Sequence, residues 1–329
     1  MLILSESDLR ALLSMSEVIE AVESGFRALA GDEATVPERL RLDVPAQEGV
    51  LLQMPAYLGS LNSPDDSALG TKIVSVFEQN AVRGLDAVQA VYLLLDSTTG
   101  VPLALMEGRF ITAIRTAATS AVATSFMSGP GAKRLAVFGA GVQAESHIGA
   151  MLQVAEVKHA MIVSRTAAKA RSLADRIRSL HGLSCELVSA EQAASTANLI
   201  CTCTSSQTPL FDGGLLNEGT HINAVGAFTP STRELDSETI RRARVIIDAE
   251  SSAGREAGEI LLPLSEGAIG KAHIIGALSD VVSGRVPGRE SPSEITVFKS
   301  CGLAIEDLVT ARLAYSRAIA ERAGTRVNL

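Results

Sequence analysis

The chain has 329 residues, and its 29 basic and 37 acidic side chains give a formal net charge of −8 at pH 7. A hydrophobic share of 47% excludes a disordered chain, and the length predicts two domains at roughly 150 residues each. The acidic balance argues against nucleic-acid binding. Only 3% of residues are aromatic and Trp is absent, so stacking platforms for bases or sugars are not expected.

No targeting, membrane or metal signal stands out. The opening MLILSESDLR lacks a basic segment, and no run of 18 apolar residues occurs. We therefore expect a cytoplasmic protein without a membrane partner. The four cysteines form no C-x-x-C pair, and the five histidines form no H-E-x-x-H motif. Neither a disulfide framework nor a metal site is predicted.

A helix followed by a small sheet is expected in the first third of the chain. Residues 16–30 place apolar side chains at helical spacing, with Ser16 as the N-cap. A polar, proline-containing connection follows over residues 36–47. β-rich segments are expected at residues 49–54, 71–77, 88–96 and 102–106. The turn Asp96–Gly100 joins the last two, which predicts a hairpin.

The pattern changes after an Ala- and Thr-rich helix expected over residues 111–127. Short apolar strands are expected at residues 135–138, 160–163, 186–188, 199–203, 221–225 and 245–248. Helices are expected at residues 142–153, 166–180 and 190–196. This alternation predicts an α/β fold with a doubly wound parallel sheet. A long last helix, residues 303–322, is expected to return to the first domain.

A glycine-rich loop is the most specific local signal. The segment Ala136-Val-Phe-Gly-Ala-Gly-Val-Gln-Ala144 has the pattern G-x-G-x-x-A between an expected strand and an expected helix. The first glycine permits a tight turn, the second leaves room for a pyrophosphate, and the alanine keeps the helix close to the sheet. Free N–H groups at the helix start favour an anion. The expected dinucleotide contacts are Gly139, Gly141, Val142, Gln143 and Ala144.

The end of the next strand bears on which dinucleotide binds. An NAD-preferring site usually carries Asp or Glu here, but this chain has Ser164, Arg165 and Thr166. A guanidinium can clamp a ribose 2′-phosphate and the two hydroxyls can donate to it. The sequence therefore favours NADP(H), with NAD(H) possible. The alternative is that Arg165 is an ordinary surface residue.

Further motifs connect the chain to a known family. They are Val50-Leu-Leu-Gln-Met-Pro-Ala-Tyr57, Gly70-Thr-Lys-Ile-Val74, Thr99-Gly-Val-Pro102, Thr112-Ala-Ile-Arg-Thr-Ala-Ala118, His221-Ile-Asn-Ala-Val-Gly-Ala227, Arg233-Glu-Leu235 and Ser300-Cys-Gly-Leu-Ala-Ile-Glu-Asp307. Together with the glycine loop, and in this order, they resemble the ornithine cyclodeaminase/mu-crystallin family. The resemblance covers nearly the whole chain.

The resemblance implies a Rossmann domain and an α/β domain that binds substrate and forms a homodimer. We place the substrate and dimerisation domain at residues 1–118, completed by residues 303–329, and the Rossmann domain at residues 119–302. Members include ornithine cyclodeaminase, archaeal alanine dehydrogenase, opine dehydrogenases and reductases of cyclic ketimines. They share hydride transfer at a carbon that bears both a nitrogen and a carboxylate, so a small imino or amino acid is the expected partner.

Three cations of the first domain match family residues that bind the substrate carboxylate. They are Arg41, Lys72 and Arg115, although nearby Arg39 competes for the role of Arg41. Arginine suits a planar carboxylate because its fork can bond both oxygens. Lys72 lies within an apolar strand, where desolvation would lower its pKa and let it donate a proton. We expect Lys72 and Arg115 to be catalytic.

Two departures from the cyclodeaminase pattern narrow the reaction. Phe228 stands where the cyclodeaminase has a catalytic aspartate, and Leu52 where it has a substrate-binding glutamate. A cyclic imine that enters already protonated needs neither carboxylate. Met54 and Phe228 would shape an apolar slot for its ring. The hypothesis is an NADPH-dependent reductase of cyclic ketimine carboxylates, with hydride transfer to C2.

Other readings stay open. They are an ornithine cyclodeaminase-like lyase, a hydroxyproline dehydratase, an alanine- or opine-type dehydrogenase, and a non-catalytic NADP-binding protein like mu-crystallin. Further family-matched cofactor contacts are Thr204, Asn223 and Val225. They are expected at the carboxyl ends of strands, where open parallel sheets bind ligands. Asp307 could equally be a charge at a helix start.

Overall fold

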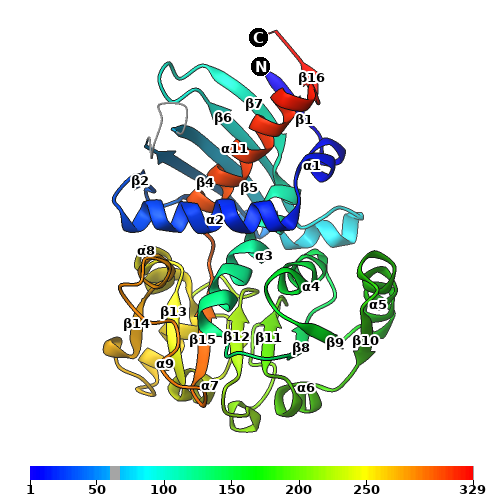
Figure 1. Cartoon of the computed structure of the whole chain (residues 1–329), viewed down its shortest axis with the longest axis vertical. Coiled ribbons are helices and arrows are strands. Elements are labelled where there is room, and N and C mark those ends of the chain that lie inside the picture. Colours follow the sequence, from blue (N-terminus) through cyan, green and yellow to red (C-terminus); the bar gives the residue numbers. More distant parts are fainter. Residues whose placement is uncertain (60–66, 329) are drawn as a thin grey trace. The chain divides into compact units, whose positions relative to one another are not determined.

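The computed structural model describes residues 1–59 and 67–328 (Figure 1). The chain divides into two compact units, the first comprising Met1–Thr116 with Leu303–Leu329 and the second Ala117–Gly302. The first boundary falls inside helix α3 (Gly108–Met127), two residues before the expected boundary at 118. In the described part of the chain, no helix is long and apolar enough to cross a membrane.

The first unit is built on a mostly antiparallel sheet of order β16-β1-β7-β6-β5-β4-β2, with β3 also paired to β4. Its strands are β1 (Leu2–Leu4), β2 (Ala34–Thr35), β3 (Leu40–Val44), β4 (Gly49–Leu58), β5 (Ala68–Phe77), β6 (Val88–Leu95), β7 (Pro102–Glu107) and β16 (Thr325–Arg326). The expected hairpin is confirmed, because β6 and β7 pair antiparallel.

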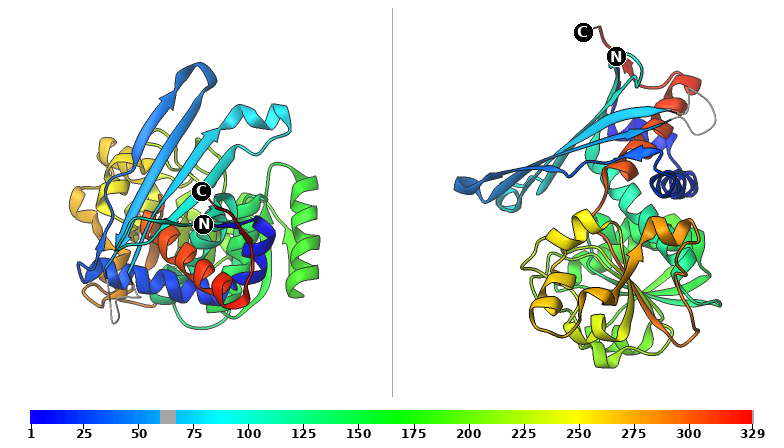
Figure 2. Two further views of the ribbon diagram at one scale, coloured as in Figure 1. Left: turned by 90° about the horizontal axis from the view of Figure 1, so that it is seen from above. Right: turned by 90° about the vertical axis from the view of Figure 1, so that its left-hand side faces the viewer.

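Helices cover one face of this sheet, and within residues 1–59 and 67–116 and the C-terminal segment no helix covers the other, bare face (Figure 2, right). They are α1 (Glu6–Leu12), α2 (Met15–Ala30) and α11 (Ala304–Glu321). Side chains along β4 and β5 alternate between buried and more exposed positions, as one covered face requires. The long last helix therefore packs in the first unit, as expected, where it contacts α2, β4 and β5.

Two local expectations were wrong. The N-cap of α2 is Ser14, whose extended backbone lets its side chain accept from the Glu17 N–H, while Ser16 already lies inside the helix. The polar connection over residues 36–47 contains strand β3, which pairs with β4. The side chains of β3 are mostly exposed, so buried and exposed positions do not alternate along it as they do in a half-buried strand. The strand forms because it pairs with β4.

The second unit is the expected doubly wound parallel sheet, of order β10-β9-β8-β11-β12-β15-β13-β14. Its strands are β8 (Lys133–Phe138), β9 (Val157–Val163), β10 (Ser184–Leu187), β11 (Leu199–Thr202), β12 (His221–Ala224), β13 (Ala243–Ile247), β14 (Ile274–Ala277) and β15 (Ile295–Lys299). Its helices, besides the end of α3, are α4 (Val142–Val154), α5 (Ala167–His181), α6 (Ala190–Thr196), α7 (Ser237–Arg242), α8 (Glu250–Glu256), α9 (Gly258–Ser265) and α10 (Leu278–Val282).

Strands β14 and β15 were not expected from the sequence. β15 is nevertheless central, since it pairs with β12 on one side and β13 on the other. Its five residues are all buried, including the polar Thr296 and Lys299, so neither alternation nor a purely apolar run marks the strand. β11 and β12 are likewise buried along their whole length, as strands covered on both faces are.

Candidate functional site

A row of four side chains crosses the covered face of the first sheet. Met54 on β4 is directly opposite Lys72 on β5, Lys72 is opposite Tyr92 on β6, and Tyr92 is opposite Met106 on β7. Opposite residues share a face of the sheet. All four are buried, and Lys72 is only 1% exposed. The structure therefore places an ammonium inside an apolar layer.

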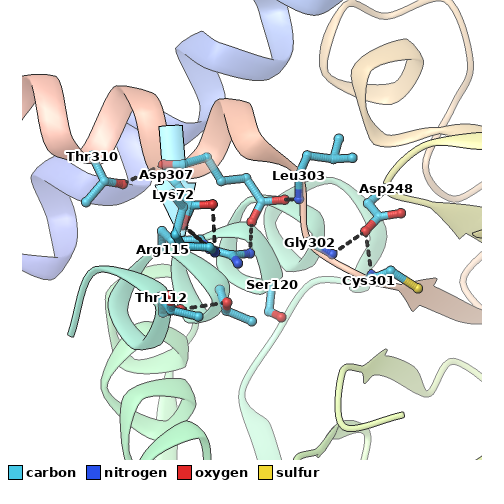
Figure 3. Close-up of polar contacts among 12 residues, drawn as sticks. Lys72, Thr112, Arg115, Ser120, Asp248, Cys301, Gly302, Leu303, Asp307 and Thr310 are labelled. Carbon is cyan, nitrogen blue, oxygen red and sulfur yellow. Dashed lines mark hydrogen bonds and ion pairs between the residues drawn. The ribbon is translucent and has the colours of Figure 1, made fainter. Parts of the chain in front are cut away.

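Two carboxylates of α11 compensate the buried cations (Figure 3). The Lys72 Nζ lies 2.9 Å from Asp307 Oδ1 and 2.8 Å from Oδ2. The Arg115 Nε donates to the same Oδ1 at 2.9 Å, and Arg115 Nη1 donates to Glu306 Oε2 at 2.5 Å. Glu306 and Asp307 are fully buried. Lys72 and Arg115, predicted separately, thus form one cluster through Asp307.

The first turn of α11 fixes these carboxylates in place. The Glu306 Oε1 accepts the Leu303 N–H at 2.9 Å and so caps the helix start. Acidic side chains near a helix N-terminus are favoured by its dipole. Asp307 is therefore the helix-start charge that the sequence suggested, and it is also the partner of Lys72 and Arg115, which the sequence did not indicate.

Burial and charge shift the pKa values of the two cations in opposite directions. Desolvation, reinforced by the neighbouring Arg115, lowers the pKa of Lys72 to about 8, although Asp307 opposes the fall. Burial also acts to lower the pKa of Arg115, but Asp307 and Glu306 outweigh it and raise that pKa. Lys72 can therefore exchange a proton near neutral pH, whereas Arg115 stays a fixed cation.

Tyr92 adds a polar group beside this cluster. Its hydroxyl is buried and has no hydrogen-bond partner among the described residues. Burial, with the Asp307 charge, raises the pKa of Tyr92, so the hydroxyl stays neutral. Gly70 makes room for it, since a Cβ there would lie 2.6 Å from the Tyr92 oxygen. Tyr92 therefore adds a neutral, buried hydroxyl next to Lys72.

Arg41 lies at the edge of the same face. It is opposite Leu52, on the covered side of β4, but its guanidinium is exposed and pairs with Asp43 at 2.7 Å. An exposed ion pair of this kind holds its members weakly. The structure therefore does not bring Arg41 into the Lys72 cluster, although it leaves the side chain accessible.

The glycine loop of the second unit fits a dinucleotide phosphate. Gly139 has φ of +114°, and a Cβ there would lie 2.4 Å from the Cys203 carbonyl oxygen, so only glycine is accommodated. Gly141 is the N-cap of α4 and makes no side-chain hydrogen bond to the helix. A Cβ at Gly141 would meet no atom within 4 Å. The start of a 13-residue helix is thus uncapped and faces open space, as an anion site requires.

The end of β9 carries the residues expected at the ribose. Arg165 is exposed, and the Thr166 N–H donates to Ser164 Oγ at 3.2 Å. Helix α5 begins directly afterwards and has no acidic residue in its first turn. Residues 164–166 therefore present a guanidinium and two hydroxyls, and no carboxylate, at the position expected for the cofactor ribose.

The remaining expected contacts differ in access. Thr204 and Val225 follow β11 and β12 and are half-buried, as is Phe228. Asn223 is fully buried inside β12, and its amide donates to Thr124 Oγ1 at 2.9 Å. Its side chain is thus engaged within the second unit, so Val225 is better placed than Asn223 to contact a cofactor.

Sequence reasoning missed the buried acidic residues that hold these elements. Glu306 and Asp307 were contained in a family-matched motif but had no assigned partner. Glu234 is fully buried and accepts hydrogen bonds from the Thr204 and Gly226 N–H groups, both at 2.7 Å. Glu306 and Asp307 stand between Ile305 and Leu308, which was the available signal, but their partners lie on β5 and α3. Glu234 follows Arg233 and gave no such signal.

Comparison with known proteins identifies the family. The model of the ornithine cyclodeaminase/mu-crystallin family matches residues 1–322, and the chain belongs to this family. It is 35% identical over 329 residues to a Delta(1)-pyrroline-2-carboxylate reductase of Bacillus cereus, covering 99% of both chains.

Two solved structures share the fold. One is Thermococcus litoralis Delta(1)-pyrroline-2-carboxylate reductase in complex with NADH and L-proline, with 42% identity, a TM-score of 0.96, and coverage of 99% of this chain and 100% of that one. The other is an archaeal alanine dehydrogenase dimer with bound NAD, with 31% identity, a TM-score of 0.93, and coverage of 99% and 98%.

Proposed function

We propose that this protein is an NAD(P)H-dependent reductase of cyclic ketimine carboxylates, which converts Δ1-pyrroline-2-carboxylate or Δ1-piperideine-2-carboxylate to proline or pipecolate. The observation that carries the proposal is the buried cluster of Lys72, Arg115 and Asp307 beside Met54. In this cluster Lys72 can donate a proton and Arg115 stays positively charged, and both lie in an apolar layer. Full-length similarity to reductases of this substrate class supports it.

Charge balance assigns the roles of the three cations. Asp307 and Glu306 already compensate Lys72 and Arg115, so the buried cluster has no net charge. A substrate carboxylate would therefore need a further cation. Arg41, exposed on the same face of the sheet, supplies it and gives up only a weak pair with Asp43. Arg115, held by Asp307 and Glu306, adds a fixed positive charge beside Lys72.

Lys72 acts as the proton donor to the substrate nitrogen. With a pKa of about 8 its ammonium is mostly protonated at neutral pH and can still release the proton. The neutral Tyr92 hydroxyl lies beside Lys72 in the same buried row, and Met54 on the other side of Lys72 keeps the surroundings of the ammonium apolar. A bound nicotinamide cofactor supplies the hydride.

NADP(H) is the preferred cofactor in this proposal, with NAD(H) accepted less well. The uncapped start of α4 binds the pyrophosphate, and Ser164, Arg165 and Thr166 bind the ribose 2′-phosphate. Supporting observations are the exposed guanidinium and the absence of a carboxylate from residues 164–169. The relative with bound NADH makes a direct comparison of the two cofactors necessary.

The same proposal includes a homodimer formed through the bare face of the first sheet. Ile73 and Val91 are opposite each other there and exposed, and Leu40 and Leu42 of β3 are also exposed. A solvent-facing sheet surface normally carries polar side chains, so an apolar one favours burial against another surface. A second copy offers the same apolar face.

The reaction is tested by following NADPH absorbance with purified protein after adding each of the two cyclic imines, with NADH in parallel. Rapid oxidation with either ring supports the reductase, and the better ring reports the pocket size. Alanine with NADP⁺, ornithine and 3-hydroxyproline are tested next. Turnover of one of these without imine reduction would identify a dehydrogenase or lyase, and no turnover at all would favour a binding protein.

A further inference from the structure

We propose that a buried network of Glu234, Glu259 and Lys299 positions the nicotinamide half of the cofactor by fixing the loops that follow β11 and β12. This inference rests on the proposed reductase function. These residues act through the backbone and are positioning residues rather than catalytic ones. All three are fully buried in the second unit.

Glu234 ties the two loops together through four hydrogen bonds. Its Oε1 accepts from the Thr204 N–H at 2.7 Å and the Thr204 hydroxyl at 2.6 Å. Its Oε2 accepts from the Gly226 N–H and the Thr202 hydroxyl, both at 2.7 Å. Thr204 follows β11 and Gly226 follows β12, so one carboxylate sets the distance between the two loops.

Glu259 and Lys299 hold the second loop at two other points. The Glu259 Oε1 accepts the Glu234 N–H at 2.9 Å, and its Oε2 lies 3.1 Å from Lys299 Nζ. Lys299, at the end of β15, also donates to the Ala227 carbonyl. The loop that carries Phe228 is therefore bonded on both sides, at Gly226 and Ala227 before it and at Glu234 after it.

Close packing shows that the loops have little freedom. A Cβ at Gly226 would lie 2.2 Å from the Thr204 carbonyl oxygen and 2.6 Å from the Glu234 carboxylate. A Cβ at Gly258 would lie 1.9 Å from the Thr232 carbonyl oxygen. Both positions therefore require glycine, and the loop conformation depends on the hydrogen bonds just described.

The network works only when Glu234 is ionised. Two of its four donors are backbone N–H groups, which cannot accept a proton in return. Burial raises the pKa of Glu234, while the hydrogen bonds and the Lys299 charge oppose that rise. Burial alone would lower the pKa of Lys299, but Glu259 outweighs it and raises that pKa. Lys299 thus stays charged and favours the carboxylate form of Glu234.

The sheet order indicates which half of the cofactor these loops meet. The glycine loop follows β8, and β9 and β11 flank β8 on opposite sides. Residues 164–166 follow β9, so the adenosine ribose lies on that side of the pyrophosphate. The nicotinamide half must extend the other way, over the carboxyl ends of β11 and β12. Those are the ends that Glu234 joins.

The variant Glu234→Gln tests this directly. The Thr204 and Gly226 N–H groups bond to different oxygens of Glu234, and the amide replaces one of these oxygens by an NH2 group, which cannot accept a hydrogen bond. We expect the Kd of NADPH, measured by fluorescence titration, to rise about tenfold, and kcat to fall as well. The Kd of 2′-phospho-ADP-ribose, which lacks the nicotinamide, should stay within about twofold of wild type when measured by calorimetry.

Two further variants keep the test decisive. Thr202→Val removes one hydroxyl donor with little change of shape, so it should weaken NADPH in the same direction even where Glu234→Gln folds poorly. Glu238→Gln changes an exposed pair with Arg241 and serves as the matched control with wild-type values. Thermal melts show whether each variant is folded.

Unchanged NADPH binding in a folded Glu234→Gln variant would overturn the proposal. Equal weakening of NADPH and 2′-phospho-ADP-ribose would also overturn it, because the network would then support the fold in general. Failure of the proposed reductase function is distinguished by wild type itself, which would bind NADPH without reducing either imine. The two binding measurements still decide the role of Glu234 in that case.

Discussion

The Lys72 ammonium and the Asp307 carboxylate form a buried ion pair of 2.8 Å, although 235 residues separate them in the chain. The pair joins strand β5 to the last long helix, which returns to the first unit and brings its first turn beside the sheet (Figure 3). Because Arg115 shares the same carboxylate, Asp307 sets the position of both cations.

The proton-donor role of Lys72 predicts a pH dependence. Its lowered pKa of about 8 means that the ammonium form is lost as the pH rises through 8. We expect kcat/KM for imine reduction to fall above that pH, and Lys72→Met to lower it by about 100-fold or more. Rate profiles from pH 6 to 10 measure this.

A fall above pH 8 can also come from deprotonation of the imine substrate. Lys72→Arg separates the two causes, because a guanidinium keeps its proton throughout this range. If kcat/KM of Lys72→Arg still falls above pH 8 as in wild type, the group that titrates is the imine of the substrate. That result would contradict the assignment to Lys72.

Replacing Asp307 by Asn should affect stability and titration together. Removing one partner of a buried ion pair leaves a charge uncompensated, which costs about 3–5 kcal/mol. The pKa of Lys72 should fall further, and the alkaline limb should move below pH 8. Urea unfolding and the rate profile measure the two effects. Glu23→Gln breaks an exposed pair with Arg27 and should cost less than about 0.5 kcal/mol.

The cofactor preference is predicted to depend on Arg165. Arg165→Asp removes a cation and places a carboxylate where the 2′-phosphate would lie, so kcat/KM with NADPH should fall about 100-fold. The value with NADH should change little or rise. Steady-state kinetics with both cofactors measure this. An equal fall of kcat/KM with NADPH and with NADH would show that Arg165 does not bind the 2′-phosphate.

The dimer proposal predicts that charge on the bare sheet face separates the subunits. Val91→Lys places an ammonium among the exposed apolar side chains of β5 and β6, and burying it unpaired is unfavourable. Light scattering should report a dimer for wild type and a monomer for the variant. Leu180→Lys, on an exposed position of α5, is the control and should remain dimeric. A dimeric Val91→Lys variant would place the interface elsewhere.

Buried His147 predicts loss of stability in acid. Its ring bonds the Ser120 hydroxyl at 2.9 Å and the Gln143 carbonyl at 2.7 Å, and burial lowers its pKa from 6.5 to about 4. The unfolded state therefore binds more protons between these values, so stability is full above pH 6.5 and falls as the pH drops. The contribution of this histidine is up to about 1.4 kcal/mol per pH unit.

Unfolding by urea at pH 8 and at pH 5 measures this effect. His147→Gln does not titrate, so its free energy of unfolding should change less between the two pH values than that of wild type. An identical pH dependence in both proteins would show that other groups cause the loss.

The sequence predicted the elements whose patterns are local. The signal lies within a short window for the helix predicted at residues 16–30, for the hairpin of β6 and β7, and for the strand, loop and helix around Gly139. Strand β15 was missed because its partners β12 and β13 lie far back along the chain. Strand β3 was missed although β4 follows it closely, because its side chains are mostly exposed and give no burial pattern. β15 is buried throughout and β3 mostly exposed, so neither shows alternation.

The residues of the site likewise fall into those with a local sequence signal and those that only tertiary packing brings together. Lys72 stood out as a charge within an apolar strand, and the structure shows it buried. The carboxylates that neutralise it, Glu306 and Asp307, could not be paired from the sequence because tertiary packing alone brings α11 to β5. Glu234 could not be paired from the sequence for the same reason, since its four donors lie at the end of β11 and on the loops after β11 and β12.

The most direct test of the reductase proposal is to follow the hydride itself. NADPH carrying deuterium on the transferring face of C4 is incubated with the enzyme and Δ1-pyrroline-2-carboxylate, and the proline formed is examined by NMR and mass spectrometry. The account predicts one deuterium at C2 of each product molecule. Proline without deuterium at C2, or no proline at all from an enzyme that binds NADPH, would contradict it.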